Sequence, residues 1–382
     1  MRGSRIPLWD NARFGCIVLV VMGHAIQRQT LDSDNALTLY LFIYAFHMPA
    51  FAIISGYFSK ASPPGTRQMR RIITDFVLPY VIFEAIWGLV QFLVEGYPAF
   101  NPTEPSWTLW FLLALAIFRL VLPYLVLLRW PLAWAALLSV GVGYLANVDS
   151  TFSLSRAIGI LPFFVLGWQL RQWKVIDRWR DLGAAVWGWR ALAVAVFAGW
   201  LVVVALHVPT FREFGLKHWF FYDDSYLDLG EPVWWAGLLR LGLIVLAVVL
   251  SAAFFALIPR RETFFSAFGQ ATMYVYLLHS FVLYPLRESG VLRDDHASAT
   301  WLLTMIFAST AIAIALSSPV VRRLFRPLVE PKPRWLFRVN DDRPDESRTD
   351  AVGARREGSG LKPSHHGYAA LQSSWPRDRS GT

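Results

Sequence analysis

The chain has 382 residues, of which 55% are hydrophobic and only 16% are charged, and its formal net charge at pH 7 is +9. A water-soluble globule needs more polar surface than this composition supplies, so lipid must solvate much of the chain. A basic balance can indicate a nucleic-acid partner in a soluble domain, but here the positive residues sit in short loops between apolar runs, and we expect no nucleic acid.

The apolar runs predict the fold class. About 20 apolar residues cross a hydrocarbon core of ~30 Å, and runs of about this length recur in the chain. We therefore predict about ten transmembrane helices, at residues 12–28, 36–58, 72–94, 107–128, 131–147, 154–171, 190–207, 233–257, 266–286 and 299–320. Because lipid offers no partner to unpaired backbone groups and these runs do not alternate like barrel strands, the prediction is an all-α, polytopic helical bundle.

The loops between these runs predict the orientation in the membrane, because short cytoplasmic loops retain Lys and Arg. One alternate set of loops is basic, with Arg2, Arg5, Lys60, Arg67, Arg70, Arg71, Arg129, Arg171, Lys174, Arg178, Arg180, Arg260, Arg261, Arg322, Arg323 and Arg326. The opposite set is acidic or nearly neutral, with Asp32, Asp34, Glu95, Glu104, Asp149, Asp223, Asp224, Asp228, Glu231, Asp294 and Asp295. We predict a multi-pass protein of the plasma (inner) membrane with both termini in the cytoplasm.

The composition changes near residue 329 to Pro, Arg, Asp, Ser and Gly. This change predicts a transmembrane domain at residues 1–328 and a disordered cytoplasmic tail at residues 329–382. His365 and His366 lie in that tail without further ligands, and the single cysteine, Cys16, lies in the first apolar run. We therefore expect no metal site and no disulfide.

Ionisable side chains inside apolar runs indicate where a site lies, because each costs at least ~2.5 kcal/mol in the middle of a bilayer and therefore faces the bundle interior. These residues are His24, His47, Glu84, Arg119, Arg156, Arg240 and His279.

The first run combines two such groups, Arg13 and His24. Eleven residues make three helical turns plus about 20°, so both side chains share one helix face about 16 Å apart along the axis. A cation at the inner mouth and a proton acceptor deep in the membrane suit a long donor with a phosphate head, such as acyl-CoA. The competing interpretation is an arginine that reaches back to the interface and a histidine that only packs.

Five segments resemble the membrane-bound acyltransferase 3 superfamily. Residues 10–24 resemble its first-helix signature, and residues 46–51 (Phe-His-Met-Pro-Ala-Phe) with 55–57 (Ser-Gly-Tyr) resemble its second-helix motif. Residues 67–70 match its Arg-x-x-Arg pattern, and residues 274–279 (Tyr-Val-Tyr-Leu-Leu-His) are similar to a looser motif late in the domain. The resemblance covers roughly residues 5 to 325.

The resemblance implies transfer of an acetyl (acyl) group from acetyl-CoA to a hydroxyl of a sugar in a surface glycan, glycolipid or secreted product. His24 is then the general base, or a nucleophile that carries the acyl group. Arg13, Arg67 and Arg70 would bind the CoA phosphates, although anchoring by positive residues also explains the last two. The run Ser106-Trp107-Thr108-Leu109 lacks the glutamate that follows it in many members, which resembles the fucose O-acetylase-like branch.

Other polar residues are candidates for supporting or substrate roles. Asp10 lies three residues before Arg13, where it would hold the guanidinium or form an ordinary interfacial ion pair. His47 lies two residues before a proline that weakens its helix, and either orients His24, binds the acceptor or joins helices. Glu84 and Arg240 would pair with each other or meet a polar acceptor. His279 is a site candidate through its loose motif, or a histidine that only joins helices.

Two further interpretations concern the outer side and the function class. Residues 217–224 combine aromatic rings with acids, as a carbohydrate-facing loop or an interfacial anchor does. A transporter or flippase for a lipid-linked glycan would also show many spans and a few buried charges. Such a transporter has no evident use for phosphate-binding cations at one mouth together with a deep base, so the sequence favours the enzyme.

Overall fold

The computed structural model describes residues 6–96, 100–231, 233–288, 298–333 and 335–337. Residues 1–332 form one compact unit, and within its described residues all regular structure is helical. Residues 333–382 form a second unit. The predicted disorder of residues 329–382 falls mainly on residues 338–382, which lie outside the described residues, so it stays a prediction.

The α-helices cover most of the first unit. They are α1 (Pro7–Ile26), α2 (Asp34–Tyr44), α3 (His47–Tyr57), α4 (Thr66–Ile72), α5 (Leu78–Glu95), α6 (Trp110–Leu125), α7 (Pro131–Val142), α8 (Leu154–Gln172), α9 (Val175–Arg180), α10 (Val186–Leu206), α11 (Val208–Glu213), α12 (Leu216–Trp219), α13 (Ala236–Leu257), α14 (Thr272–Glu288), α15 (Ala299–Leu316) and α16 (Pro319–Val329).

The predicted class, a polytopic helical membrane protein, is confirmed. Among the described residues, six helical stretches are long and apolar enough to cross a membrane: Asp34–Tyr57, Thr66–Val94, Thr151–Gln172, Gly183–Leu206, Ala236–Leu257 and Ala299–Leu316. Two further apolar helices, α6 and α7, are shorter. The 20-residue α1 has the length of a span but carries Asp10, Asn11, Arg13 and His24. The count of ten spans stays a prediction.

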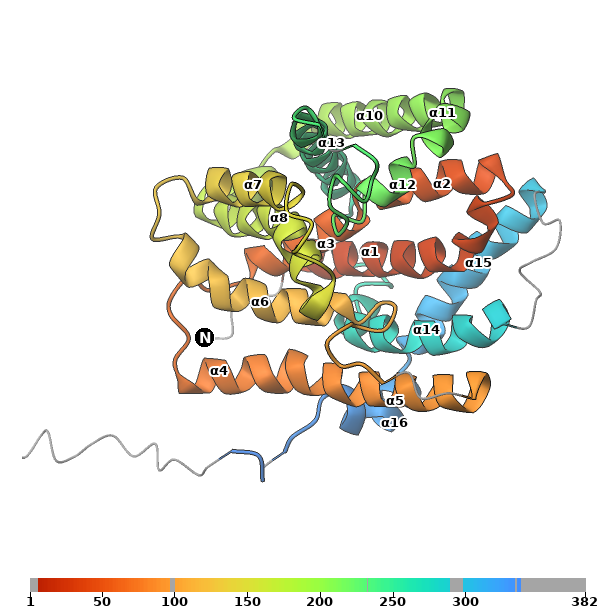
Figure 1. The fold of residues 1–382 in the computed structure, drawn as a ribbon. Helices are drawn as coiled ribbons and strands as arrows, with labels where there is room; N and C mark the ends of the chain where they lie inside the picture. The colour runs from red at the N-terminus through yellow and green to blue at the C-terminus, as the bar shows by residue number, and fades with distance from the viewer. Residues whose placement is uncertain (1–5, 97–99, 232, 289–297, 334, 338–382) are drawn as a thin grey trace, which may run out of the picture. The chain divides into compact units, whose positions relative to one another are not determined.

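Helix α1 lies in the middle of the compact unit, with other helices around it (Figure 1). It packs against α2, α3, α14 and α15, and its buried face includes Ile17, Val20 and Val21. A helix that is buried on several sides can present polar groups to the interior of a bundle rather than to lipid. The position of α1 therefore allows Arg13 and His24 to face cavities.

Helices α3 and α8 cross with their backbones close together. A Cβ atom at Gly56 would overlap the carbonyl oxygen of Phe164, and a Cβ atom at Gly167 would overlap that of Ile53. Small residues at such crossings allow membrane helices to gain van der Waals contact. This crossing fixes the position of α3, whose first residue is His47.

The predicted span 36–58 is broken between α2 and α3. Phe46 has non-helical backbone angles, and α3 restarts at His47 with Pro49 in its first turn. A proline is tolerated there because the first-turn N–H groups of a helix have no intrahelical partner. The break places His47 at a helix start inside the membrane region.

The predicted span 72–94 contains a π-helical segment at Ile73–Val77, between α4 and α5. Such wide turns inside α-helices are often found at functional sites. This one carries Phe76, whose ring lies 4.3 Å from the guanidinium carbon of Arg119 on α6. The π segment thus brings the third predicted span against the fourth at a half-buried cation.

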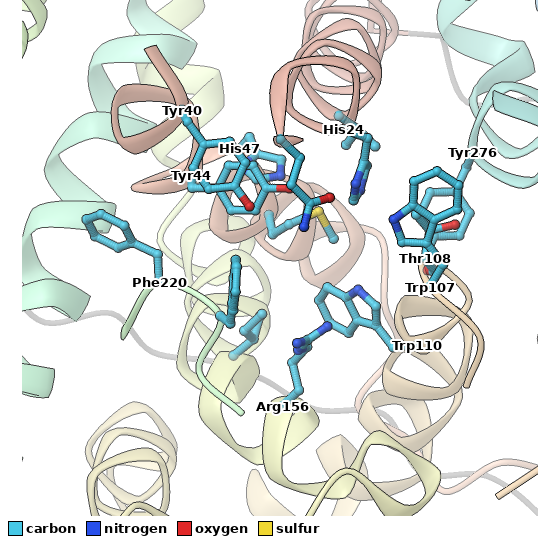
Figure 2. Close-up of a pocket in the computed structure, with 15 residues that line it drawn as sticks. His24, Tyr40, Tyr44, His47, Trp107, Thr108, Trp110, Arg156, Phe220 and Tyr276 are labelled. Atoms are coloured by element: carbon cyan, nitrogen blue, oxygen red, sulfur yellow. The ribbon is translucent and has the colours of Figure 1, made fainter. Parts of the chain in front are cut away.

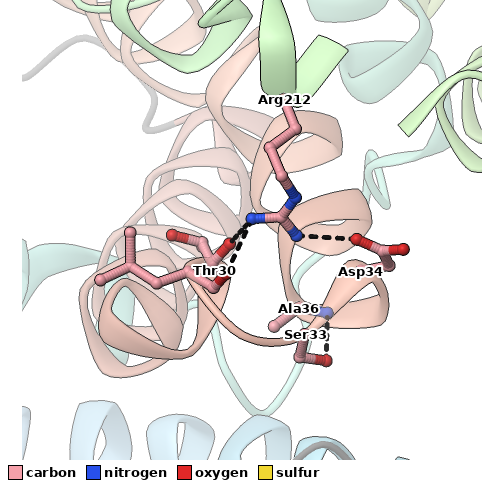
Figure 3. A network of polar contacts seen from close by, with 6 residues as sticks. Thr30, Ser33, Asp34, Ala36 and Arg212 are labelled. Atoms are coloured by element: carbon pink, nitrogen blue, oxygen red, sulfur yellow. Dashed lines mark hydrogen bonds and ion pairs between the residues drawn. The ribbon is translucent and has the colours of Figure 1, made fainter. Parts of the chain in front are cut away.

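Arg212 of α11 links α11 to the turn before α2 (Figure 3). Its guanidinium donates hydrogen bonds to the carbonyl oxygens of Thr30 (2.6 Å) and Leu31 (3.0 Å), and to the Asp34 carboxylate at 2.7 Å. Ser33 caps the start of α2 by accepting a hydrogen bond from the Ala36 N–H at 3.3 Å. These bonds hold the end of α1 that carries His24 against the segment that follows α10.

Candidate functional site

The N-terminal end of α1 is held by Asn11, whose side chain is buried. Its amide nitrogen donates to the carbonyl oxygens of Pro259 (2.9 Å) and Arg261 (3.0 Å). Its amide oxygen accepts from the hydroxyl groups of Thr263 (2.9 Å) and Ser266 (2.6 Å). Four bonds from one side chain fix the position of α1 relative to the loop after α13, and with it the positions of Arg13 and His24.

His24 lines a cavity of about 170 Å³ between the helices. His47 and Arg156 also line it, and Figure 2 shows the His24 and Arg156 side chains pointing into it from opposite sides. We call this space the outer cavity because His24 lies towards the end of α1 that is predicted, from the loop charges, to face the outside. Aromatic rings form much of its wall: Tyr40, Tyr44, Trp107, Trp110, Phe220, Phe221 and Tyr276.

Two further histidines accompany His24. The ring of His279 lies 5.5 Å from that of His24 between centroids. The Nδ1 atom of His279 lies 3.0 Å and 2.8 Å from the carbonyl oxygens of Val275 and Tyr276, and Nδ1 of His47 lies 3.0 Å from that of Ile43. A carbonyl oxygen only accepts, so these contacts assign the hydrogen to Nδ1 and leave Nε2 of each neutral ring as an acceptor.

The Nδ1 atom of His24 and the Nε2 atom of His279 have no hydrogen-bond partner among the described residues. Buried polar groups usually have partners, and one without a partner beside a cavity is available to a substrate or to a water molecule. His24 of α1 and His47 of α3 therefore line one cavity, and His279 of α14 lies beside His24 without lining that cavity.

Arg13 lines a second cavity of about 180 Å³, which we call the inner cavity. Its guanidinium nitrogen lies 3.3 Å from the Asp10 carboxylate, and its carbon lies 4.8 Å from the centre of the Phe58 ring. The predicted contact between Asp10 and Arg13 is present. Asp10 therefore restricts the directions in which the Arg13 side chain points.

The inner cavity contains a second cation, Arg119 of α6. Its guanidinium rests on the Phe76 ring and donates to the carbonyl oxygen of Leu115 at 3.3 Å. We gave Arg119 no role from the sequence, although its charge within an apolar run was the signal. The structure thus places two guanidinium groups, from α1 and α6, on the wall of one cavity.

The two cavities meet at Tyr276. Among the described residues that line them, Tyr276 alone is common to both. Its hydroxyl donates to the carbonyl oxygen of Thr108, which lines the outer cavity. The same four helices, α1, α3, α6 and α14, contribute residues to both cavities. The Arg13/His24 face of α1 therefore runs along two cavities that share Tyr276 in their walls.

Arg67 and Arg70 lie on α4 and do not line either cavity. Arg67 is exposed and Arg70 is half-buried. Helix α4 leads directly into the π segment, whose Phe76 borders the inner cavity. The assignment of Arg67 and Arg70 to CoA phosphates stays a prediction.

Glu84 and Arg240 have separate partners rather than each other. The Glu84 carboxylate accepts from the backbone N–H (2.9 Å) and the hydroxyl (2.6 Å) of Ser106. Arg240 donates to the carbonyl oxygens of Ser139 (3.4 Å) and Asp224 (3.1 Å). The suggested pairing between them is wrong, because the chain places a closer polar partner beside each. Glu84 holds the segment that leads into Thr108 and α6, and Arg240 holds the segment at residues 217–224, which we call the outer loop.

The outer loop reaches the outer cavity through Phe220 and Phe221. Asp223 forms an ion pair with Arg156, whose guanidinium also lies 4.7 Å from the Trp110 ring centre. Trp219 in the same loop is buried in the core. The loop predicted at residues 217–224 therefore closes one side of the cavity, and Arg156, which we had not assigned to the site, is the side chain that attaches it.

Comparison with protein families gives one match. Residues 6–318 match the model of the acyltransferase 3 family, described as an acyltransferase domain. No curated protein and no solved structure matches the chain. The family match covers most of the chain, including every residue that lines the two cavities. The protein therefore belongs to the acyltransferase 3 family of membrane acyltransferases.

Proposed function

We propose that this protein transfers an acetyl group from acetyl-CoA, which arrives from the cytoplasm, to a sugar hydroxyl in a surface glycan, glycolipid or secreted product. The observation that supports this is the placement of Arg13 and His24 on one face of α1, each at its own cavity, with Tyr276 between the cavities. The arrangement offers a cationic entrance for the donor and a base where the acyl group would arrive.

The reaction needs one proton acceptor and no metal. Neutral His24 takes the proton of the sugar hydroxyl as its oxygen attacks the thioester carbonyl. The C–S bond breaks, an ester forms, and the proton passes from His24 to the departing CoA sulfur. A base of this kind typically contributes 10²–10⁴-fold to the rate.

The donor would lie along the inner cavity. Guanidinium groups bind phosphate oxygens by paired, charge-assisted hydrogen bonds, and the wall offers Arg13 and Arg119. Arg67 and Arg70 would meet the parts of CoA that remain outside this cavity, because a volume of about 180 Å³ is too small for the whole molecule.

The acceptor would enter the outer cavity. Tyr44, Trp107 and Trp110 present flat rings and polar edges on its wall. Such side chains combine apolar area with hydrogen-bonding groups, which suits a sugar. His47 and Arg156 supply further polar groups to its hydroxyls.

The test measures ester groups on cell-envelope and secreted glycans by mass spectrometry. It compares cells that carry the intact protein, no protein, His24→Ala or His207→Ala at matched abundance. His207 is an exposed histidine at the end of α10 and serves as the control. We expect protein-dependent esters to disappear in the deletion and in His24→Ala but to persist in His207→Ala.

The modified sugar would then identify the acceptor. If the esters persist in the deletion while an unmodified glycan accumulates inside the cell, the protein is a transporter and the proposal is wrong. Equal ester content in His24→Ala and intact cells would remove His24 from the mechanism.

A further inference from the structure

The position of Tyr276 carries an inference about which acyl groups the protein transfers, and it rests on the proposed function. The side chain is 6% exposed and lies on α14, three residues before His279. Its ring borders the inner cavity with Arg13 and the outer cavity with His24. Because Tyr276 belongs to both walls, the route that the proposed function implies, from a donor at Arg13 to an acceptor at His24, runs past this ring.

The ring is held in place from several directions. Its hydroxyl donates to the carbonyl oxygen of Thr108, which lies just before α6 begins at Trp110. The Phe111 ring lies 6.2 Å away and the His279 ring 6.3 Å away between centroids. A side chain fixed by a buried hydrogen bond and by packing on two sides does not move aside freely.

The space beyond the ring is small. The outer cavity has a volume of about 170 Å³, and the acyl group must share it with the hydroxyl that attacks. Packed interiors respond to the addition of a single methylene, because the surrounding side chains relax only in part. In an enzyme whose pocket discriminates between substrates by size, one methylene changes the selectivity by about 10–200-fold.

We infer that Tyr276 selects the acyl chain length: its ring, fixed on the Thr108 carbonyl, admits an acetyl group to the His24 cavity and excludes longer acyl chains. Removing the ring is expected to open the two cavities to each other at their shared wall. Longer chains then extend into the volume that the ring occupied while the thioester carbonyl still reaches His24.

The experiment measures a ratio, so it does not require a known acceptor. Cells without the native protein express the intact protein or a variant together with a butyrate-activating CoA ligase, and grow with butyrate. Mild base releases ester-linked acids from envelope and secreted glycans. Mass spectrometry gives the butyryl-to-acetyl ester ratio, which is divided by the butyryl-CoA to acetyl-CoA ratio in the same cells.

We expect the intact protein to give a normalised ratio about 100-fold below one, from about tenfold for each of two methylenes. Tyr276→Ala and Tyr276→Leu should raise it at least tenfold, whereas Tyr276→Phe, which keeps the ring, should raise it least. Tyr124→Ala is the control, because Tyr124 on α6 is 62% exposed and lines neither cavity.

Two results would overturn the inference while the acetyl esters of the intact protein still support the proposed function. One is an unchanged ratio in Tyr276→Ala and Tyr276→Leu. The other is a complete loss of esters in both variants at normal membrane abundance, since a residue that only limits length is dispensable for acetyl transfer. No protein-dependent ester in any cells would instead refute the proposed function itself.

Discussion

The imidazole rings of His24 on α1 and His279 on α14 lie 5.5 Å apart between centroids, although they come from opposite ends of the membrane domain's sequence. Carbonyl oxygens hold Nδ1 of His279, so its Nε2 atom is the free acceptor. If His24 takes a proton during transfer, a neutral acceptor beside it stabilises the imidazolium that forms. We therefore expect His279 to act as a positioning residue for the proposed base.

Replacing His279 should test this relationship. We expect His279→Ala to lower ester formation at least tenfold, since a hydrogen bond to a charged group contributes about 1.5–3 kcal/mol. His279→Gln keeps an acceptor and should restore part of the rate. Ser280→Ala, at a buried neighbour on the same helix, should leave the rate near normal. Equal loss in the Ala and Gln variants would indicate a packing role only.

Arg119 should affect the donor rather than the chemical step. Arg119→Ala removes one of two guanidinium groups from the inner cavity, so the KM for acetyl-CoA should rise by about tenfold with a smaller change in kcat. Initial rates of ester formation in membrane vesicles, measured over a range of acetyl-CoA concentrations, give both constants. Arg129→Ala, at an exposed arginine beyond α6, is the control and should change neither. A fall in kcat without a rise in KM would contradict donor binding.

The ion pair between Arg156 and Asp223 should couple the outer loop to the cavity. Removing either partner leaves a charge that is only 21% or 17% exposed, so Arg156→Ala or Asp223→Ala should lower the free energy of unfolding by about 1.5–3 kcal/mol. The double variant should lose less than the sum of the two single variants. Thermal unfolding of the purified protein in detergent measures this coupling, and strict additivity would mean that the pair contributes nothing.

The crossing of α3 and α8 should tolerate no added methyl group. Gly56→Ala forces a Cβ atom against the Phe164 carbonyl, so we expect a loss of about 1–3 kcal/mol in the free energy of unfolding. Gly242→Ala is the matched control: it lies within α13, where an added Cβ meets nothing within 4 Å. Alanine favours helix over glycine by about 1 kcal/mol, so the control should be neutral or more stable. Equal melting temperatures for the two variants would contradict the close crossing.

The predicted orientation can be tested with introduced cysteines, because the single native Cys16 is buried. Ser62 and Ser150 are both exposed and lie in loops of opposite predicted sides. In intact spheroplasts, a membrane-impermeant maleimide should label Ser150→Cys, and it should label Ser62→Cys only after the membrane is opened. The reverse pattern would invert the topology and would place the Arg13 end outside.

The sequence by itself determined the class of the fold and the family. Apolar runs, basic loops and the spacing of Arg13 and His24 are local properties of the chain, and helical geometry alone places those two side chains on one face. The broken second span was also foreseeable from Pro49 beside His47. The contact between Asp10 and Arg13 follows from their separation of three residues.

Only the tertiary structure decided which faces of different helices meet. The apolar pattern predicts that a transmembrane helix exists but not which helices pack against it. The reason is that lipid and protein interiors present similar apolar surroundings to a helix. For that reason the sequence did not predict the partners of Glu84 and Arg240 or the placement of Arg119 and Arg156 on cavity walls. It also did not predict that Tyr276 lies in the walls of both cavities. A tyrosine within an apolar run does not by itself indicate a function. Tyr276 comes to lie between the cavities of Arg13 and His24 only because α14 packs against α1.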